Sequence, residues 1–299
     1  MHVTIRLMPM LAAALALAAC ERAESPTPEP AVETTVPTIV PVDEAVVVTD
    51  EAEARLAAIL AGAHRSEVHR ARDRYRNPGA TLGFFGLRPD MTVVEIWPGA
   101  DGWYTEVIAP YVNETGQYYG AHFDPESERE FALRARAAFV AKLEASPELY
   151  GNAEVTALSC PNLYEIAPPE SADLVLAFRS LHNWMGAGCV DDALAAVMAA
   201  LKPGGVFGLV GHRSKLDDPQ DPRAPRGYVR QDYAIALVEA AGFEFVDSSE
   251  VNANPLDPTD HERGVWTLPP MLALGDQDRE RYLEIGESDR FTLKFRRPE

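Results

Sequence analysis

Residues 92–112 constrain the fold of this chain more than any other segment. Val93, Val94 and Ile96 are apolar and β-branched without polar alternation, which predicts a parallel strand covered on both faces. A glycine-containing turn follows, and a second apolar run after it predicts a helix. Glu95 interrupts the strand and needs a polar partner, because an unpaired buried carboxylate destabilises a fold. A strand, a glycine turn and a helix in this order are typical of a nucleotide-like cofactor site.

The same segment resembles motif I of the class I S-adenosylmethionine-dependent methyltransferases, in which an acidic residue precedes glycines at alternate positions. Aligned without gaps, Trp97 stands at the first glycine position, Gly99 at the second and Asp101 at the third. A one-residue insertion would instead make Gly102 the third. Glycine tolerates positive φ and lets backbone approach a ligand, so Trp97 and Asp101 would narrow or reshape the turn. The resemblance implies that S-adenosylmethionine binds at Glu95, Trp97, Gly99, Ala100, Asp101 and Gly102.

Predicted strands and helices alternate after this turn. Strands are predicted at residues 117–125, 154–158, 171–184, 206–210, 243–246 and 291–295, and helices at 190–201 and 232–241. The sequence LKPGG stops the first of these helices and closely resembles the turn before the fifth strand of the methyltransferase class. The resemblance covers residues 65–297. It implies an α/β, Rossmann-like, doubly wound fold with a seven-stranded, mostly parallel sheet and an antiparallel final strand pair.

Residues 252–286 separate the last two predicted strands and are too rich in Pro, Asp and Gly for a simple turn. We interpret them as an insertion with a short helix near residues 276–283. Its length and Trp266 favour a lid that closes over the pocket. The stretches RARDRYRNP and EIWPG also resemble a bacterial group of predicted methyltransferases that carry export signals.

Three histidines, His122, His182 and His212, follow or end predicted strands. Each alone is explained as a polar residue at a strand end, but together they favour a pocket at the ligand-binding edge of a doubly wound sheet. The resemblance implies that His182 faces the transferring methyl group, where it can act as a general base. It also implies a ribose contact at Asp124, although the family's position falls nearer His122. Arg179 either binds a carboxylate of cofactor or substrate, or forms a structural ion pair.

The N-terminus has the pattern of a bacterial lipoprotein signal. Arg6 precedes an apolar run at residues 7–18, and the sequence Leu-Ala-Ala-Cys ends at Cys20. The run is too short to span a bilayer, and small residues precede the cysteine as a signal peptidase requires. We therefore expect residues 1–19 to be removed and Cys20 to be lipidated, anchoring the chain on the periplasmic side of the envelope. Glu21, in place of aspartate, favours the outer membrane.

Residues 20–50 contain many acids and prolines but no glycine or aromatic residue, which predicts a disordered tether. The remaining residues 51–299 suit one methyltransferase-like α/β domain with an N-terminal helical part at 51–90. We interpret the arginines of that part as a solvated helix face paired with acids, in preference to a role in substrate binding or cap closure. They are Arg65, Arg70, Arg72, Arg74 and Arg76.

The formal net charge of −19 argues against nucleic acid as a partner. An acidic chain also gains little from anionic headgroups, so we expect membrane contact through the N-terminal lipid only. The expected partner is a small-molecule acceptor, and the sequence leaves the oligomeric state open.

Cys160 and Cys189 remain once Cys20 is assigned to lipidation. An oxidising periplasm allows them to form one disulfide, but sequence does not fix whether their Cα atoms lie within bonding range, so paired and free thiols both stay open. Neither cysteine belongs to a CxxC pattern and the chain has no HExxH helix, so no metal site is expected.

The resemblance implies methyl transfer from S-adenosylmethionine to a small or medium acceptor. Export raises a physical objection, because this cofactor is made in the cytosol. The alternative is a degenerate methyltransferase fold that acts as a periplasmic ligand- or protein-binding lipoprotein. Trp97, Asp101 and His122 favour the binding protein, whereas Glu95, Gly99, Asp124 and the intact LKPGG turn favour the enzyme. A nicotinamide-dependent dehydrogenase is disfavoured by the glycine pattern and the antiparallel ending.

Overall fold

The computed structural model describes residues 50–299. The predicted signal peptide, the lipidation of Cys20 and the tether as far as residue 49 lie outside the described residues. Within residues 50–299, no helix is both long enough and apolar enough to cross a membrane.

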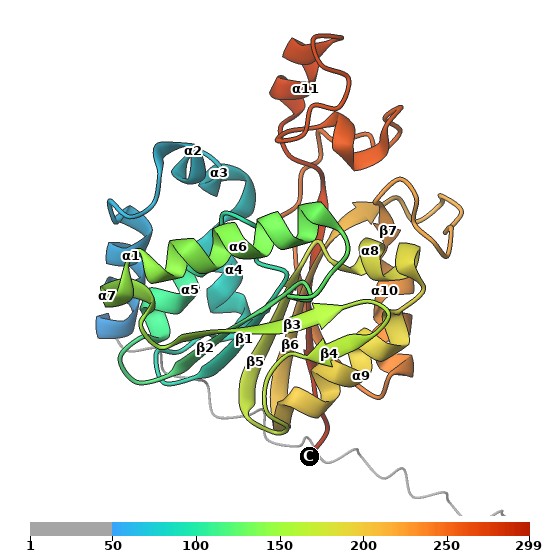
Figure 1. The fold of residues 1–299 in the computed structure, drawn as a ribbon. Coiled ribbons are helices and arrows are strands. Elements are labelled where there is room, and N and C mark those ends of the chain that lie inside the picture. Colours follow the sequence, from blue (N-terminus) through green and yellow to red (C-terminus); the bar gives the residue numbers. More distant parts are fainter. Residues whose placement is uncertain (1–49) are drawn as a thin grey trace, which may run out of the picture. The chain divides into compact units, whose positions relative to one another are not determined.

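A mixed sheet forms the centre of the described chain (Figure 1). Its strand order is β4-β3-β2-β1-β5-β6-β9-β8, and β7 pairs with the end of β6. Strands β3, β2, β1, β5 and β6 are mutually parallel, whereas β9 is antiparallel to β6 and β8. The prediction of a mostly parallel, Rossmann-like sheet with an antiparallel final pair is confirmed. The strands are β1 Thr92–Ile96, β2 Gln117–His122, β3 Ala153–Ser159, β4 Leu163–Glu165, β5 Ala172–Phe178, β6 Leu201–Ser214, β7 Val229–Arg230, β8 Glu244–Ser249 and β9 Arg290–Arg296.

The predicted number of seven strands is too low for the described chain, whose sheet has nine. The two additional strands are β4, which is antiparallel to β3, and β7, which is parallel to the end of β6. They are 3 and 2 residues long, too short to produce a recognisable alternation of apolar and polar residues.

The predicted strand at residues 171–184 is wrong in its second half. Strand β5 ends at Phe178, and Arg179 has a φ of +60°, a left-handed conformation that cannot continue a strand. Helix α8 (Leu181–Ala187) follows instead. The predicted strand at 117–125 also ends early, at His122, because Asp124 turns the chain by accepting a hydrogen bond from the Glu126 amide at 2.8 Å.

Helices cover both faces of the sheet (Figure 1). Successive residues of β1 and β5 enter two separate apolar clusters, because neighbouring side chains of a strand point to opposite faces. One cluster contains residues of α4, α5 and α6, and the other contains residues of α8, α9 and α10. The bounds of these helices are α4 Pro78–Phe85, α5 Thr105–Val112, α6 Glu130–Glu144, α9 Val190–Ala200 and α10 Gln231–Ala240.

The remaining helices lie in the N-terminal part, in the chain before β3 and in the insertion. They are α1 Asp50–Ala61, α2 Glu67–Arg70, α3 Asp73–Arg76, α7 Pro147–Tyr150, the 3-10 helix η1 Gly264–Thr267 and α11 Arg279–Ile285. Helix α11 corresponds to the short helix predicted near residues 276–283.

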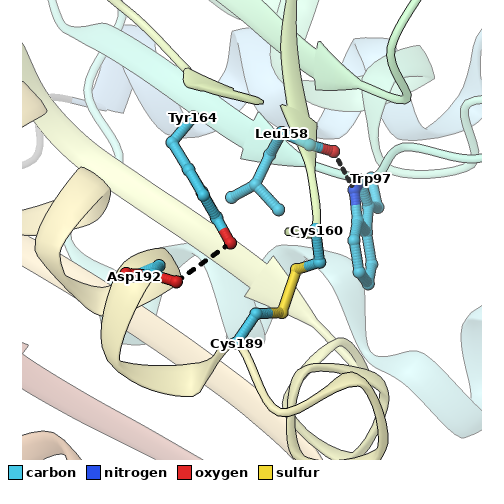
Figure 2. The surroundings of a disulfide bond; sticks show 6 residues. All are labelled: Trp97, Leu158, Cys160, Tyr164, Cys189 and Asp192. Carbon is cyan, nitrogen blue, oxygen red and sulfur yellow. Dashed lines mark hydrogen bonds between the residues drawn. A yellow bond between two sulfur atoms is a disulfide. The ribbon is translucent and has the colours of Figure 1, made fainter. Parts of the chain in front are cut away.

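A disulfide joins Cys160, directly after β3, to Cys189, which precedes α9 (Figure 2). Their Cα atoms are 6.0 Å apart. The bond therefore ties the loop after β3 to the α8–α9 junction on one face of the sheet. Figure 2 also shows the Tyr164 hydroxyl donating to Asp192 on α9 at 3.3 Å, a second link between the same regions.

Replacing both Cys160 and Cys189 with serine should lower the free energy of unfolding by about 3 kcal/mol, because a cross-link across 29 residues restricts the unfolded chain. Urea denaturation of the oxidised wild type and the double variant measures this difference. A reductant should bring the wild type to the variant's midpoint and leave the variant unchanged. Equal midpoints for the oxidised proteins would show that the bond contributes no stability.

Candidate functional site

A cavity of about 370 Å³ lies where the carboxyl ends of β1 and β5 meet. Strand β1 pairs with β2 on one side and β5 on the other, so the strand order reverses here, as at the ligand-binding crevice of doubly wound folds. The cavity walls come from the turn at residues 98–103, the chain after β5, and the insertion. The N-terminal helical part adds His69, Arg72 and Arg76. Its volume is within the range of small-molecule sites.

The predicted glycine turn contributes Gly99, Ala100, Asp101 and Gly102 to the cavity wall. Gly99 has a φ of +77°, and a Cβ placed on it would meet nothing within 4 Å. Its open side is therefore available to a ligand. Gly102 has a φ of +56°, but a Cβ there would lie 3.0 Å from Phe139 Cε2, so this glycine is needed for internal packing.

Trp97 adopts the left-handed backbone conformation expected of a glycine, with a φ of +53°. Its indole N–H donates to the Leu158 carbonyl at 2.7 Å (Figure 2). The ring centroids of Trp97 and Trp184 are 6.2 Å apart. Trp97 is not among the residues that line the cavity. The turn thus keeps its backbone path although the first glycine of the motif is replaced.

Glu95 is 3% exposed and lies beneath the turn, away from the cavity wall. Its carboxylate accepts hydrogen bonds from the Thr105 hydroxyl and the Tyr118 hydroxyl, both at 2.8 Å. Burial raises the pKa of Glu95 to about 7, although both hydrogen bonds favour the ionised form. Glu95 therefore connects β1, the start of α5 and β2.

The two residues considered for the ribose contact lie outside the cavity lining. Asp124 accepts from the backbone amide of its own turn. His122 is fully buried, and its Nδ1 accepts from the Phe123 amide at 2.8 Å, which leaves Nε2 to donate to the Gly99 carbonyl at 3.4 Å. Burial lowers the pKa of His122 to about 4, so the imidazole is neutral at physiological pH.

His182 and His212 both line the cavity, with ring centroids 5.3 Å apart. Burial, and then the charge of Arg179, lower the pKa of His182 to about 4. Its ring nitrogens have no hydrogen-bond partner among residues 50–299, so they remain available to a ligand. Burial also lowers the pKa of His212, whose Nδ1 lies 2.5 Å from the Ser288 hydroxyl.

Arg179 lines the same cavity, directly after β5. In the described part of the chain, no hydrogen bond or ion pair joins its guanidinium to another residue. Burial, and then the nearby charge of Arg290, lower the pKa of Arg179 to about 10. The structure therefore provides no structural ion pair of the kind that the sequence left open.

The interpretation of the N-terminal arginines as a solvated helix face is wrong for Arg65 and Arg76, which are 0% and 4% exposed. Both guanidinium groups stack near the Trp103 ring, at 5.3 and 4.8 Å from its centroid. Arg72 and Arg76 line the cavity, and each donates through Nε to Glu287, at 2.7 and 3.0 Å. Helical periodicity identified this face but not the chain segment that packs on it.

Glu287, Ser288 and Arg290 are cavity residues that sequence reasoning missed. They follow the insertion, in a segment without a recognisable motif. The insertion itself contributes Val265, Trp266 and residues 269–271 to the wall. Trp266 lies 5.9 Å from His182, measured between ring centroids. Closure of the insertion as a lid stays a prediction.

Comparison with known proteins identifies the fold. No family model matches the chain, and no curated protein matches it in sequence. Its structure is similar to that of a SAM dependent methyltransferase from Aquifex aeolicus, with 16% identity, a TM-score of 0.50, and coverage of 76% of this chain and 92% of that one. It is also similar to the [4+2]-cyclase SpnF, with 17% identity, a TM-score of 0.51, and coverage of 79% and 85%. The chain therefore has a methyltransferase-type fold, and the different names of these two proteins show that fold alone does not fix the reaction.

Replacing Glu95 with glutamine should change how stability depends on pH. A folded-state pKa near 7 means that the native protein retains a proton that the unfolded chain releases above about pH 4.5, so this group reduces stability as pH rises from about 4.5 to 7. Glutamine cannot ionise, and its amide oxygen can accept the same two hydrogen bonds. The stability of the variant relative to wild type should rise by about 2–3 kcal/mol between pH 5 and pH 8.

Urea denaturation at several pH values measures this change. Glu144 is exposed, so Glu144→Gln is the control for the loss of one negative charge. A constant difference between wild type and Glu95→Gln across this pH range would contradict the raised pKa.

Proposed function

We propose that this chain is an S-adenosylmethionine-dependent methyltransferase that acts on a small acceptor. One observation carries the proposal: Gly99 presents an open, left-handed backbone position to a cavity that also contains His182. The cofactor turn and the proposed general base thus line one cavity at the reversal of strand order.

The turn fits the cofactor at Gly99 and at the neighbouring backbone of Ala100 and Asp101, which line the cavity. When bound, S-adenosylmethionine supplies an electrophilic methyl group on a sulfonium centre. Glu95, Trp97 and Asp124 do not line the cavity, so we assign the first two to supporting the turn and give Asp124 no contact with the cofactor. Gly102 serves packing against Phe139.

His182 is suited to take the proton that an acceptor nucleophile loses, because its imidazole is neutral and has no hydrogen-bond partner among residues 50–299. A pKa of about 4 makes this imidazole a weak base. Catalysis would therefore depend mainly on orienting the acceptor and excluding water. Trp266 and Met271 of the insertion provide apolar wall for that purpose.

The proposed location is the periplasmic side of the bacterial envelope, with the chain held at the outer membrane by lipid on Cys20. The supporting observations are the apolar run at residues 7–18, the Leu-Ala-Ala-Cys sequence and the acidic, proline-containing segment after it. The resemblance to exported bacterial methyltransferases through RARDRYRNP and EIWPG supports the same location.

Replacing Cys20 with serine should release the protein from the membrane fraction of a bacterial expression host, because a single lipidation site is the proposed anchor. Fractionation with immunodetection measures the distribution, and mass spectrometry of the N-terminal peptide identifies the acyl groups. Cys189→Ser, which leaves the proposed lipidation sequence intact, is the control. An unchanged membrane fraction for Cys20→Ser would contradict the lipid anchor.

Calorimetric titration of the full-length protein with S-adenosylhomocysteine tests the proposed activity. We expect a Kd on the order of micromolar. Gly99→Arg should weaken binding by at least about 100-fold, because the new side chain would project into the open space that the ligand needs.

Gly188→Arg is the matched control, since Gly188 also has a positive φ, of +72°, and open space around its Cβ, but does not line the cavity. Both variants place an arginine at a positive φ, so both strain the backbone in the same way. Only Gly99→Arg should weaken ligand binding. Absence of binding by folded wild type would favour the alternative of a degenerate, ligand- or protein-binding lipoprotein.

A further inference from the structure

The cavity contains an excess of positive charge that the proposed reaction does not explain. Arg72, Arg76, Arg179 and Arg290 all line it, and the only buried carboxylate among its lining residues is Glu287. His182 and His212 are neutral at physiological pH because their pKa values are lowered. This concentration of cations is unusual in a chain with a net charge of −19.

Several guanidinium nitrogens of this cluster lack partners. Arg290 is 2% exposed, and its buried Nε has no hydrogen-bond partner. The buried Nη2 of Arg72 is also without one. The guanidinium of Arg179 has neither a hydrogen bond nor an ion pair with any residue of the described chain. Arg72 Nη2 and Arg290 Nε are too buried to meet a ligand, whereas the Arg179 guanidinium lies at the cavity wall, so this arrangement favours an anionic ligand that binds to Arg179.

The backbone of Arg179 provides a separate observation. Its φ of +60° is unfavourable for a residue with a side chain, and its N–H donates to the Val210 carbonyl at 2.6 Å, which fixes the residue at the end of β5. Glycine would adopt this conformation at lower energy. The Arg179 side chain lies in the cavity without a protein partner, so it adds no stabilising contact to the fold.

We propose that the methyl acceptor carries an anionic group, a carboxylate or phosphate, which binds to the Arg179 guanidinium, while Arg72, Arg76 and Arg290 add positive charge to the same cavity. This proposal rests on the proposed methyl transfer, because it names the acceptor class of that same cavity. S-Adenosylmethionine combines a sulfonium and an ammonium with one carboxylate, so its net charge is positive and it does not balance the cluster. An anionic acceptor does.

The anionic group that binds to Arg179 could belong to either of two molecules. One is the methyl acceptor, and the other is the cofactor, through its carboxylate. Inorganic phosphate separates them when it is titrated into the full-length protein with and without saturating S-adenosylhomocysteine. An acceptor site predicts that phosphate binds in both cases and leaves the affinity for S-adenosylhomocysteine unchanged. Competition between the two would overturn the assignment to the acceptor and place the cofactor carboxylate on the arginines.

Arg179→Met tests the residue itself. We expect phosphate to bind at least tenfold more weakly to this variant, at constant ionic strength, with S-adenosylhomocysteine affinity retained. Arg88→Met, which removes an exposed arginine paired only with exposed Asp90, should bind phosphate like wild type. Equal phosphate affinity for Arg179→Met and wild type would overturn the proposal.

Thermal unfolding provides a second readout that a structural role would not produce. Without phosphate, Arg179→Met should be at least as stable as wild type, because it removes a cation that has no partner and lies near Arg290. Phosphate should then raise the Tm of wild type more than that of the variant.

Arg136→Met serves as the comparison for a structural arginine, since Arg136 donates to three backbone carbonyls and its loss should lower Tm. A similar loss of Tm in Arg179→Met would assign Arg179 to the fold and overturn the proposal.

The two proposals fail in different ways. Binding of S-adenosylhomocysteine without any phosphate binding would overturn the anionic acceptor and leave methyl transfer standing. Phosphate binding by a protein that does not bind S-adenosylhomocysteine would overturn methyl transfer, and with it the assignment of the anion site to a methyl acceptor.

Discussion

One buried carboxylate, Glu287, joins the segments that surround the cavity. It is 2% exposed and accepts hydrogen bonds from Arg72, Arg76 and Arg290. Burial acts to raise the pKa of Glu287, but the three guanidinium groups outweigh it and hold this pKa below its usual range. Without this negative charge, three adjacent cations would repel one another. Glu287 therefore links the N-terminal helical part, the end of the insertion and β9.

The glycine turn divides support and ligand contact between different residues. Glu95 lies below the turn and accepts from Thr105 and Tyr118, which connects β1 to α5 and β2. Trp97 extends away to the Leu158 carbonyl on β3. Gly99 alone combines a positive φ with open space on its Cβ side and a place in the cavity wall. A buried acid and an aromatic anchor thus hold the backbone from which one glycine faces the cavity.

Local patterns in the sequence predicted the sheet, its helices and the glycine turn. Apolar periodicity and the Gly and Pro residues that end helices and strands are both visible within short stretches of sequence. The arginine cluster could not be predicted in the same way. Glu287 binds Arg72 and Arg76 across 215 and 211 residues, and no pattern at either end specifies the other. The same limit explains the wrong interpretation of Arg76 as solvated: periodicity identifies a helix face but not what covers it. The left-handed conformation of Arg179 gave no signal either, since that conformation usually marks glycine.

The charge of the site and the chemistry of His182 are linked through Arg179. Burial is the larger cause of the low pKa of His182, and the charge of Arg179 adds to it. The ring also packs against His212 and Trp266, neither of which supplies a negative charge. An anion bound to Arg179 would offset that positive charge and raise the pKa of His182 towards the range in which imidazole is an effective base. Under the proposed function, the acceptor's own negative charge would therefore improve the base that deprotonates it, and a neutral acceptor would lose both its binding contact and this activation.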